Sequence, residues 1–424
     1  MYKKYIELLR SEMIPALGCT EPIAVAYVAA KAREALGEFP DRMELHVSGN
    51  VVKNVKGVTV PNSGGQKGVA VAGVLGVISN SADLELQVLE AVTPEDIKQA
   101  GALIKSGFVQ CVLEEGVENL YIRAVVFSGE HTAEATLEKK HNRITSVKRD
   151  GVTLFRQGDN ATVEKDVDKS FLTVRGILDF ANNVSIERVK DVLDNQIEMN
   201  SQIAQEGLAH GYGAQVGKML LKTQGDAVSV RAKACAAAGS DARMGGCALP
   251  VVINSGSGNQ GLTVSLPVIE YARELGLEME QTYRALLVSN LISIHIKRYI
   301  GSLSAFCGAV SAACAAGAAI TYMHGGTYDQ ICSTIVNTLG NTSGIVCDGA
   351  KASCAAKIAV AVESAIMAHN MSMNGLVYPA DTGIIKEDIE KTIQSIGYLG
   401  RTGMKKTDLT ILDIMLDNVH FPGA

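Results

Sequence analysis

The feature that most limits the possible folds is the position at which strand patterns stop. Within residues 41–176, short segments such as Met43–Ser48 alternate apolar and polar residues between charged turns, as in an antiparallel sheet with one solvated face. Beyond Ile177, nearly every segment has helical spacing, and the chain is longer than one hydrophobic core usually supports. We therefore predict an α+β protein with a smaller α+β lobe at 41–176 that contains an antiparallel sheet, a mainly helical lobe at 177–424, and an N-terminal helical segment at 1–40 that packs on the helical lobe.

Several segments carry a pattern clear enough to predict their type. Residues 2–35 have helical spacing interrupted by a loop at 14–22, and the β-branched run 51–60 favours extended chain. Segment 302–323 has no charged residue, but its Ala, Gly and Ser content is too weakly apolar for a membrane span and predicts a buried helix. The other predicted strands are 120–126, 132–137, 143–147 and 152–155, and the other predicted helices are 69–78, 186–219, 226–238, 267–275, 279–300, 328–339, 349–369 and 386–397.

The composition excludes several classes of protein. A net charge of -6 and a pI of about 5.8 give no basic surface for nucleic acid or an anionic membrane. No apolar signal segment follows Met1, and the nine cysteines are an odd number scattered along the chain, so the disulfide framework of a secreted protein is not expected. Tryptophan is absent and 42 residues are glycine, which favours closely packed helices over an aromatic cleft. We expect a cytoplasmic protein that acts on a small molecule.

Three cysteines stand apart from the rest. Cys347 lies in a glycine-bracketed loop, Cys354 follows it in the opening turns of a predicted helix, and Cys307 precedes a glycine. Thiolates at loops and helix starts can converge near backbone N–H groups, as a negatively charged metal cluster requires. Their spacing matches no compact ferredoxin pattern, so a three-cysteine site and three packed thiols both stay open. The cysteines predicted to be packing residues are Cys111, Cys235, Cys247, Cys314 and Cys332.

A glycine-rich segment follows the apolar run 251–253. Segment 255–261, of sequence SGSGNQG, offers backbone N–H groups and short polar side chains that suit an anion such as a carboxylate. A simple turn is the plain alternative. Segment 62–68, of sequence NSGGQKG, repeats the arrangement more weakly. The candidate substrate-binding residues are Ser255, Ser257, Asn259 and Gln260 in the first segment, and Asn62 and Ser63 in the second.

Two further positions combine reactive side chains with constrained surroundings. Cys19 and Glu21 lie in a proline-bounded loop, which is either a helix cap or a catalytic loop. A thiol just before a helix start is expected to have a lowered pKa. His295 lies on a strongly apolar helix twelve residues before Cys307, and it is either a core residue or a catalytic side chain that faces the same pocket.

Together, these motifs resemble the L-cysteine desulfidase family, which is related to the alpha portion of iron–sulfur L-serine dehydratases. The resemblance spans the whole chain and rests on LGCTEP near the start, SGSGNQG in the middle, and Cys307, Cys347 and Cys354 in order. It implies independence from pyridoxal phosphate and an oxygen-sensitive [4Fe–4S] cluster that these three cysteines hold, with one iron open to substrate. It also implies that Cys19 is a substrate-side thiol, either a base or a temporary fourth ligand, and it leaves the role of His295 unsettled.

We therefore expect β-elimination from L-cysteine, giving pyruvate, ammonia and hydrogen sulfide, by a homodimer whose helical lobe is catalytic. L-Serine dehydration is the second candidate reaction. It ranks behind the reaction of cysteine because iron suits a soft sulfur leaving group better than an oxygen. A pyridoxal-phosphate lyase would use Lys218, Lys222 or Lys233, but the helical region after Leu262 lacks the alternating strands of that fold. A non-enzymatic iron–sulfur sensor is the third alternative, and no basic DNA-binding helix supports it.

Overall fold

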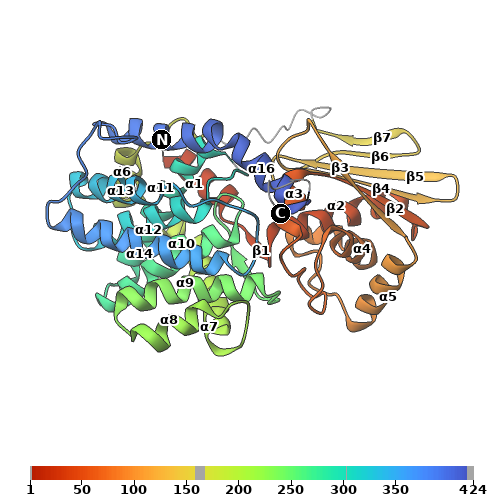
Figure 1. The fold of residues 1–424 in the computed structure, drawn as a ribbon, viewed down its shortest axis with the longest axis horizontal. Coiled ribbons are helices and arrows are strands. Elements are labelled where there is room, and N and C mark those ends of the chain that lie inside the picture. Colours follow the sequence, from red (N-terminus) through yellow and green to blue (C-terminus); the bar gives the residue numbers. More distant parts are fainter. Residues whose placement is uncertain (1, 158–167, 302, 418–424) are drawn as a thin grey trace, which may run out of the picture.

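The computed structural model describes residues 2–157, 168–301 and 303–417. Two lobes lie side by side (Figure 1), one built around a six-stranded sheet and the other almost wholly helical. The α+β fold class predicted from the sequence is confirmed. Within the described ranges, no helix combines the length and apolar character needed to cross a membrane.

The sheet of the smaller lobe has the strand order β3-β2-β4-β5-β6-β7. Every neighbouring pair is antiparallel except β2 and β3, which are parallel. The sheet is therefore mixed, not wholly antiparallel as predicted, because helices α3, α4 and α5 form a long crossover between β2 and β3. The strands are β2 (Arg42–Ser48), β3 (Val109–Glu114), β4 (Tyr121–Ser128), β5 (His131–Glu138), β6 (Ile144–Arg149) and β7 (Val152–Arg156).

Helices cover one face of this sheet (Figure 1). Alternate side chains of β4 and β5 are buried under them, which is the pattern of a sheet with one packed face. Gly76 lets two of these helices approach closely, because a side chain there would overlap the backbone of Ala26. The helical segments of this lobe are α2 (Thr20–Leu36), α3 (Gly49–Val55), α4 (Val69–Ser79), η1 (Ala82–Gln87) and α5 (Pro94–Lys105).

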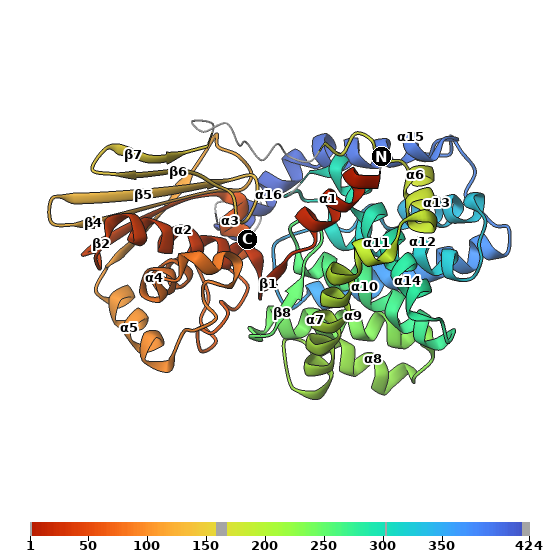
Figure 2. The ribbon, with the colours of Figure 1, turned by 180° about the vertical axis from the view of Figure 1, so that it is seen from behind.

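The first forty residues divide between the two lobes (Figure 2). Helix α1 (Tyr2–Glu12) packs on the helical lobe, where the rings of Tyr2 and Tyr5 contact Phe180. Strand β1 (Pro15–Leu17) then pairs with β8 (Pro250–Val252). Helix α2 lies instead against the sheet. The prediction that segment 1–40 packs on the helical lobe therefore fits α1 and β1 but is wrong for α2, whose nearly all-round apolar surface is buried under β4 and β5.

Helix α12 lies at the centre of the helical lobe, in contact with α10, α11, α13 and α14. Its Ala-rich surface is buried throughout residues 309–321, as predicted for this charge-free segment. Small side chains allow the neighbouring helices to approach it closely. The helices of this lobe are α6 (Val174–Asn183), η2 (Ile186–Arg188), α7 (Lys190–Ala209), α8 (Val216–Gln224), α9 (Val228–Met244), α10 (Gly258–Glu274), α11 (Met279–Ile300), α12 (Gly308–Met323), α13 (Tyr328–Thr342), α14 (Cys354–Met373), α15 (Ile389–Tyr398), η3 (Leu399–Gly403) and α16 (Lys405–Met415).

Three segments differ from the sequence predictions. The run 51–60, expected to be extended, begins with helix α3, because Val51 and Val55 gain a buried position by facing the interior one helical turn apart. The long helix predicted at 186–219 is broken between α7 and α8, where Gly213 has a positive φ. Helix α10 begins at Gly258 and not near Pro267, so the glycine-rich segment forms its first turn.

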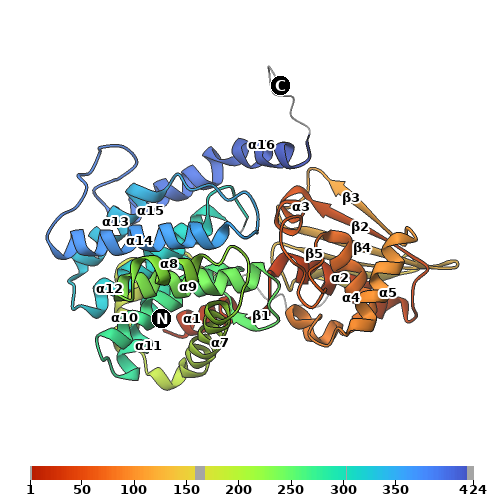
Figure 3. The same ribbon diagram turned by 60° about the horizontal axis from the view of Figure 1, so that its bottom comes forward.

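Helix α16 returns from the helical lobe to the sheet lobe and lies beside α3 (Figure 3). The Asp408 carboxylate forms a buried ion pair with the ammonium of Lys53, and the Met415 carbonyl accepts a hydrogen bond from Lys56. Leu412 packs on Gly49, where a larger residue would overlap it. These contacts therefore hold α3 next to the helical lobe. They also hold Asn54 of α3, which lines a cavity between the two lobes.

Candidate functional site

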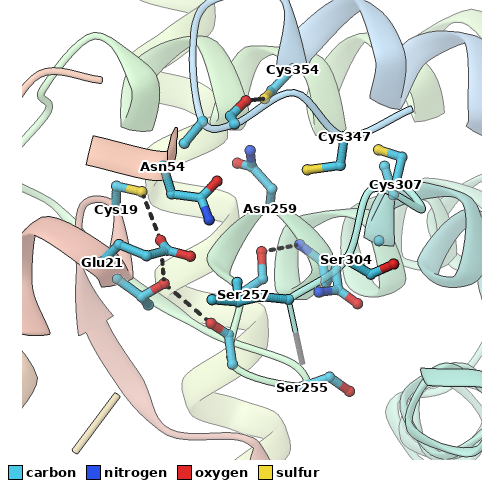
Figure 4. A pocket seen from close by; sticks show the side chains of 18 of the residues that line it. Cys19, Glu21, Asn54, Ser255, Ser257, Asn259, Ser304, Cys307, Cys347 and Cys354 are labelled. Carbon is cyan, nitrogen blue, oxygen red and sulfur yellow. Dashed lines mark hydrogen bonds between the residues drawn. The ribbon is translucent and has the colours of Figure 1, made fainter. Parts of the chain in front are cut away.

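A cavity of about 110 Å³ lies where the two lobes meet, and we call it the central cavity. Its walls come from the starts of α2 and α10, from α3, and from the loops that carry the three singled-out cysteines. Figure 4 shows Cys307, Cys347 and Cys354 on one side, Cys19 and Glu21 on the other, and Asn259 between them. The predicted site residues that line the cavity are Cys19, Glu21, Ser255, Ser257, Asn259, Gln260, Cys307, Cys347 and Cys354.

Four helices begin at this cavity. Cys19 is the N-cap of α2, Ser257 the N-cap of α10 and Cys307 the N-cap of α12, while Cys354 is the first residue of α14. The N-terminal end of a helix carries unpaired N–H groups and a partial positive charge, so it stabilises anions. The backbone therefore makes the central cavity suitable for thiolates, a carboxylate or a negatively charged cluster.

The loops of Cys307 and Cys347 are held together by their backbones. The Cys347 N–H donates to the Ala305 carbonyl at 2.6 Å, and the Cys307 N–H donates to the Ile345 carbonyl at 3.1 Å. The Cys354 thiol lies near the Gly349 carbonyl at 3.7 Å. Burial, together with the neighbouring Cys347, raises the pKa of Cys307 to about 12, and burial also raises the pKa of Cys354. Without a cation these two side chains are therefore neutral thiols.

The chemistry of this donor set fits an iron–sulfur cluster better than a single ion. All three thiols are free and face one cavity. Among the described residues, no group of three or more His, Cys, Asp or Glu side chains is placed to hold one metal ion. Cysteine thiolates are the usual ligands of iron–sulfur clusters. The surroundings are also cationic, because Lys357 lies close enough to affect Cys307 and Cys354 electrostatically.

The loop between Cys347 and Cys354 has a fixed shape. Gly349 adopts φ 95° and lies against the Lys53 carbonyl, which a side chain there would overlap. Asp348 forms ion pairs with both Lys351 and Lys357, and the Lys357 ammonium also donates to the Val346 carbonyl at 2.9 Å. Burial would raise the pKa of Asp348, but the two lysines outweigh it and the pKa is lowered. These contacts therefore hold the loop in place, and Gly349, Lys53 and Lys357 themselves line the cavity.

On the opposite wall, Glu21 is in contact with both a thiol and an imidazole. The Cys19 thiol donates to Glu21 Oε2 at 3.2 Å, and His141 Nε2 lies 3.6 Å from Glu21 Oε1. Burial would raise the pKa of Glu21, but His141 and Cys19 outweigh it and lower the pKa to about 2. Burial and the charge of Glu21 raise the pKa of Cys19 well above its usual value. The lowered pKa expected for Cys19 is therefore wrong, because desolvation exceeds the effect of the helix start.

Arg243 connects the glycine-rich segment with the Cys19 loop. Its guanidinium is only 2% exposed; it donates to Asn259 Oδ1 at 2.6 Å and to the Gly18 carbonyl. Gly258 makes room for it, since a side chain there would overlap the guanidinium. Burial lowers the pKa of Arg243, and the ionised Glu21 opposes this shift. The cavity thus contains a buried cation beside the start of α10.

Three predicted site residues lie elsewhere. His295 does not line the central cavity; its Nε2 contacts Glu390 Oε2 at 2.6 Å, and burial lowers its pKa. It points from α11 toward α15, so it is a core residue, the first of the two roles considered for it. Asn62 donates to the Leu89 and Glu90 carbonyls and so ties its loop to the segment after η1, whereas Ser63 donates to the Gln66 carbonyl within its own loop. The lysines proposed for a Schiff base, Lys218, Lys222 and Lys233, are also absent from the cavity wall.

The cavity residues that were not identified from the sequence include Asn54, His141, Arg243 and Lys297. His141 lies in the turn between β5 and β6, and Arg243 is near the end of an Ala-rich helix, where both resemble ordinary surface residues. Lys297 follows His295 by two positions on α11, so the two side chains leave the helix in different directions. Only the glycines after Arg243 could have drawn attention to one of these four positions.

Comparisons with known proteins agree over most of the chain. Residues 83–413 match the family model described as serine dehydratase alpha chain. A UPF0597 protein of Lachnoclostridium phytofermentans is 51% identical over 98% of this chain and 100% of its own length. UPF0597 proteins of Desulfitobacterium hafniense and Bacteroides fragilis are 48% and 38% identical, over 98% and 97% of this chain and 97% of their own lengths. The family model begins after Cys19, Glu21 and Asn54, whereas these relatives cover nearly the whole chain.

Proposed function

The chain belongs to the UPF0597 family and contains a serine dehydratase alpha chain domain, and from this premise we propose that it is a lyase that removes the β-substituent of a small amino acid. L-Cysteine is the first-choice substrate, giving pyruvate, ammonia and hydrogen sulfide. The observation that carries the proposal is one cavity in which three thiols face a carboxylate–imidazole pair, with a helix N-terminus between them. β-Elimination needs a group that takes the α-proton, a partner for the leaving group and an anchor for the carboxylate, and this cavity has candidates for each.

Cys307, Cys347 and Cys354 would hold a [4Fe–4S] cluster. Two of them are at helix N-termini, where the backbone stabilises negative charge. When bound, the cluster would supply an open iron that acts as a Lewis acid on the leaving sulfur. The three thiols lie on the opposite wall from Cys19 (Figure 4), so a substrate between the walls would have its β-substituent on one side and its α-proton on the other.

The start of α10 and Arg243 are the best partners for the substrate carboxylate. The N–H groups of the first turn of α10 and a buried guanidinium are strong donors to an anion. Because Arg243 already donates to Asn259 Oδ1, Asn259 acts here by positioning the guanidinium. The side-chain oxygen of Gln260 is buried and has no donor among the described residues, which makes it a suitable acceptor for the substrate ammonium.

His141 is the best candidate for the base. Its Nε2 is buried in the cavity wall and has no hydrogen bond among the described residues, although the ionised Glu21 lies 3.6 Å away. Imidazole is the usual proton acceptor near neutral pH. After it takes the α-proton, the resulting imidazolium would be stabilised by the Glu21 carboxylate. Cys19, which donates to the other oxygen of Glu21, would hold that carboxylate in position.

The reaction then balances as follows. The α-proton passes to His141, the Cβ–S bond breaks, and the sulfur leaves with its bonding electrons as hydrosulfide. The remaining enamine gains a proton at Cβ, and addition of water to its imine form releases ammonium and pyruvate. Walls from two lobes would hold the reactants in one orientation, which lowers the entropic part of the barrier.

L-Serine is the second candidate substrate, because the matching family model is that of serine dehydratase. The decisive experiment is anaerobic purification followed by assays for pyruvate and sulfide with each amino acid. We expect iron in the protein, with sulfide and pyruvate formed in equal amounts from cysteine. Pyruvate from serine alone would select the second candidate. An iron-loaded protein that turns over neither amino acid would contradict both.

A further inference from the structure

A second cavity, of about 340 Å³, adjoins the central cavity. The two share four lining residues: His141, Ser255, Gly256 and Lys297. Its remaining wall comes from the loop after β5, from the ends of α1 and α11, from Arg401 in η3, and from Leu86, Lys169 and Ile253. We call this second cavity the basic antechamber, because its charge is opposite in sign to that of the chain.

The described lining of the antechamber contains six cationic side chains and only one carboxylate, that of Glu12. Glu12 forms an ion pair with Lys169 at 2.7 Å, and Lys139 pairs with Glu118, outside the lining, at 3.3 Å, so the positive surplus of the wall rests on Lys297, Arg298 and Arg401 in a chain of net charge -6. A concave wall with one sign of charge concentrates ions of the opposite sign. The cationic residues are Lys139, Lys140, Lys169, Lys297, Arg298 and Arg401.

The two guanidinium groups of this wall are fixed by backbone contacts. Arg298 donates to the Lys169 carbonyl and to the Tyr299 hydroxyl, and Arg401 donates to the Arg298 carbonyl at 2.8 Å. The Nε of Arg298 is buried and has no acceptor among the described residues. The cationic wall is therefore organised before any ligand arrives, which reduces the entropic cost of binding.

Lys297 supplies an independent indication of a ligand. Lys297 is 6% exposed and lines both cavities. Among the described residues its ammonium has no hydrogen bond or ion pair, and the thiols of Cys347 and Cys307 are the groups of opposite charge that act on it electrostatically. A buried ammonium group without a partner is costly. An anion at the boundary between the two cavities would provide the missing partner.

We propose that the basic antechamber binds a small carboxylate anion, with the 2-oxo acid formed in the central cavity as its natural occupant. The anion site follows from the charges and the unpartnered Lys297, whereas the identity of the occupant rests on the proposed function. β-Elimination converts a zwitterionic amino acid of zero net charge into a 2-oxo acid anion, so a cationic exit favours the product over the substrate. The antechamber is thus a product site on the way out of the central cavity.

Direct binding of pyruvate tests this independently of turnover. Calorimetric titration of the purified full chain with pyruvate should show binding, and the affinity should fall as salt is added. Methyl pyruvate, which has the same shape without the charge, should bind at least tenfold more weakly. The double variant Lys169→Gln/Arg401→Gln should weaken pyruvate binding at least tenfold. The double variant Lys98→Gln/Lys105→Gln, which removes two charges from the distant helix α5, should bind like the parent protein.

Pyruvate binding unchanged in the Lys169/Arg401 variant would place the anion in the central cavity alone and overturn the proposal. Failure of the parent protein to bind pyruvate at millimolar concentration would do the same. A protein that binds pyruvate at this site but eliminates neither cysteine nor serine would keep the antechamber as a carboxylate site and refute the proposed reaction. The two proposals can therefore fail separately.

Discussion

The imidazole of His141 and the carboxylate of Glu21 lie 3.6 Å apart, although they belong to a sheet turn and to the first turn of a helix. Both residues are less than 10% exposed. Both residues belong to the sheet lobe and line the central cavity. This lobe therefore contributes side chains to the site and does not only support it.

Replacement of His141 should therefore affect the chemical step. His141→Gln should lower kcat by about 10²–10⁴, the usual contribution of a general base, while the iron content stays unchanged. His131→Gln is a matched control, because His131 lies at the other end of β5 and is exposed. Steady-state kinetics with iron analysis checks both variants. A His141→Gln enzyme with normal kcat would move the search for the base to Cys19.

The cysteines should separate into two groups. Cys347→Ser should lose iron and activity together, because Cys347 is proposed as a ligand. Cys19→Ala should keep its iron and lose most of its activity, because it removes the thiol that donates to Glu21 and leaves that carboxylate less well placed. Cys111→Ser, on exposed strand β3, is the control that should change neither property. If Cys347→Ser retains a full complement of iron, the proposed ligand set is wrong.

The shape of the cysteine loop depends on Gly349. Gly349→Ala should destabilise the protein by about 1–3 kcal/mol, since it forces a side chain into a left-handed backbone and toward the Lys53 carbonyl. The loss of iron should accompany the lower Tm. Gly344→Ala, three residues before Cys347 and with nothing within 4 Å of the added Cβ, should behave like the parent protein. Thermal unfolding of the two variants measures the difference, and equal Tm values would contradict this view of the loop.

Asn259 tests the anchor for the carboxylate. Asn259→Ala removes the acceptor of the Arg243 guanidinium and should raise KM about tenfold or more, in line with the loss of about 1.5–3 kcal/mol for a hydrogen bond to a charged group. The iron content should remain normal. Asn259→Asp, which keeps an acceptor, should be less impaired in KM than the alanine variant. Loss of iron in the alanine variant would instead assign the segment to support of the cysteine loops.

At acid pH, the titration of His369 should lower the stability of the helical lobe. Burial, with a contribution from the neighbouring His324, lowers its pKa to about 4, whereas an unfolded histidine titrates near 6.5. Between these values the unfolded state binds more protons, so stability falls as the pH falls from about 6.5 toward 4. His369→Gln should flatten that part of the Tm–pH curve. His210→Gln, at an exposed position, should leave the curve unchanged, and an unflattened curve for His369→Gln would exclude this cause.

Long amphipathic or apolar helices were predictable because their pattern is local. Helix α11 has the bounds that the sequence predicted, 279–300. The sheet was predictable as strands but not as a mixed sheet, because the parallel pairing of β2 with β3 is a long-range contact. Likewise, a β-branched run predicted extended chain at 51–60, but burial of Val51 and Val55 favours helix α3. Tertiary packing decided both outcomes.

The residues of the site likewise divide into those that the local sequence indicates and those that it does not. Cys19, Cys347 and the glycine-rich segment carry unusual local sequences, and the structure brings them to one cavity. His141 and Arg243 could not be identified, because nothing in their local sequence distinguishes a side chain that faces a cavity from one that faces solvent. His295 illustrates the reverse case. Its apolar surroundings correctly indicated burial, but they do not reveal that it contacts Glu390 on α15.

The pairing of β1 with β8 has a consequence for biosynthesis. A chain that leaves the ribosome exposes Cys19 first, but β1 has no partner until residues 250–252 have been made, and Cys354 emerges later still. Helix α16, which holds α3 in place, is translated near the end. The central cavity therefore does not exist in the nascent chain, and any prosthetic group must be delivered to the finished polypeptide. A cluster held by these cysteines would then be inserted after translation, not during it.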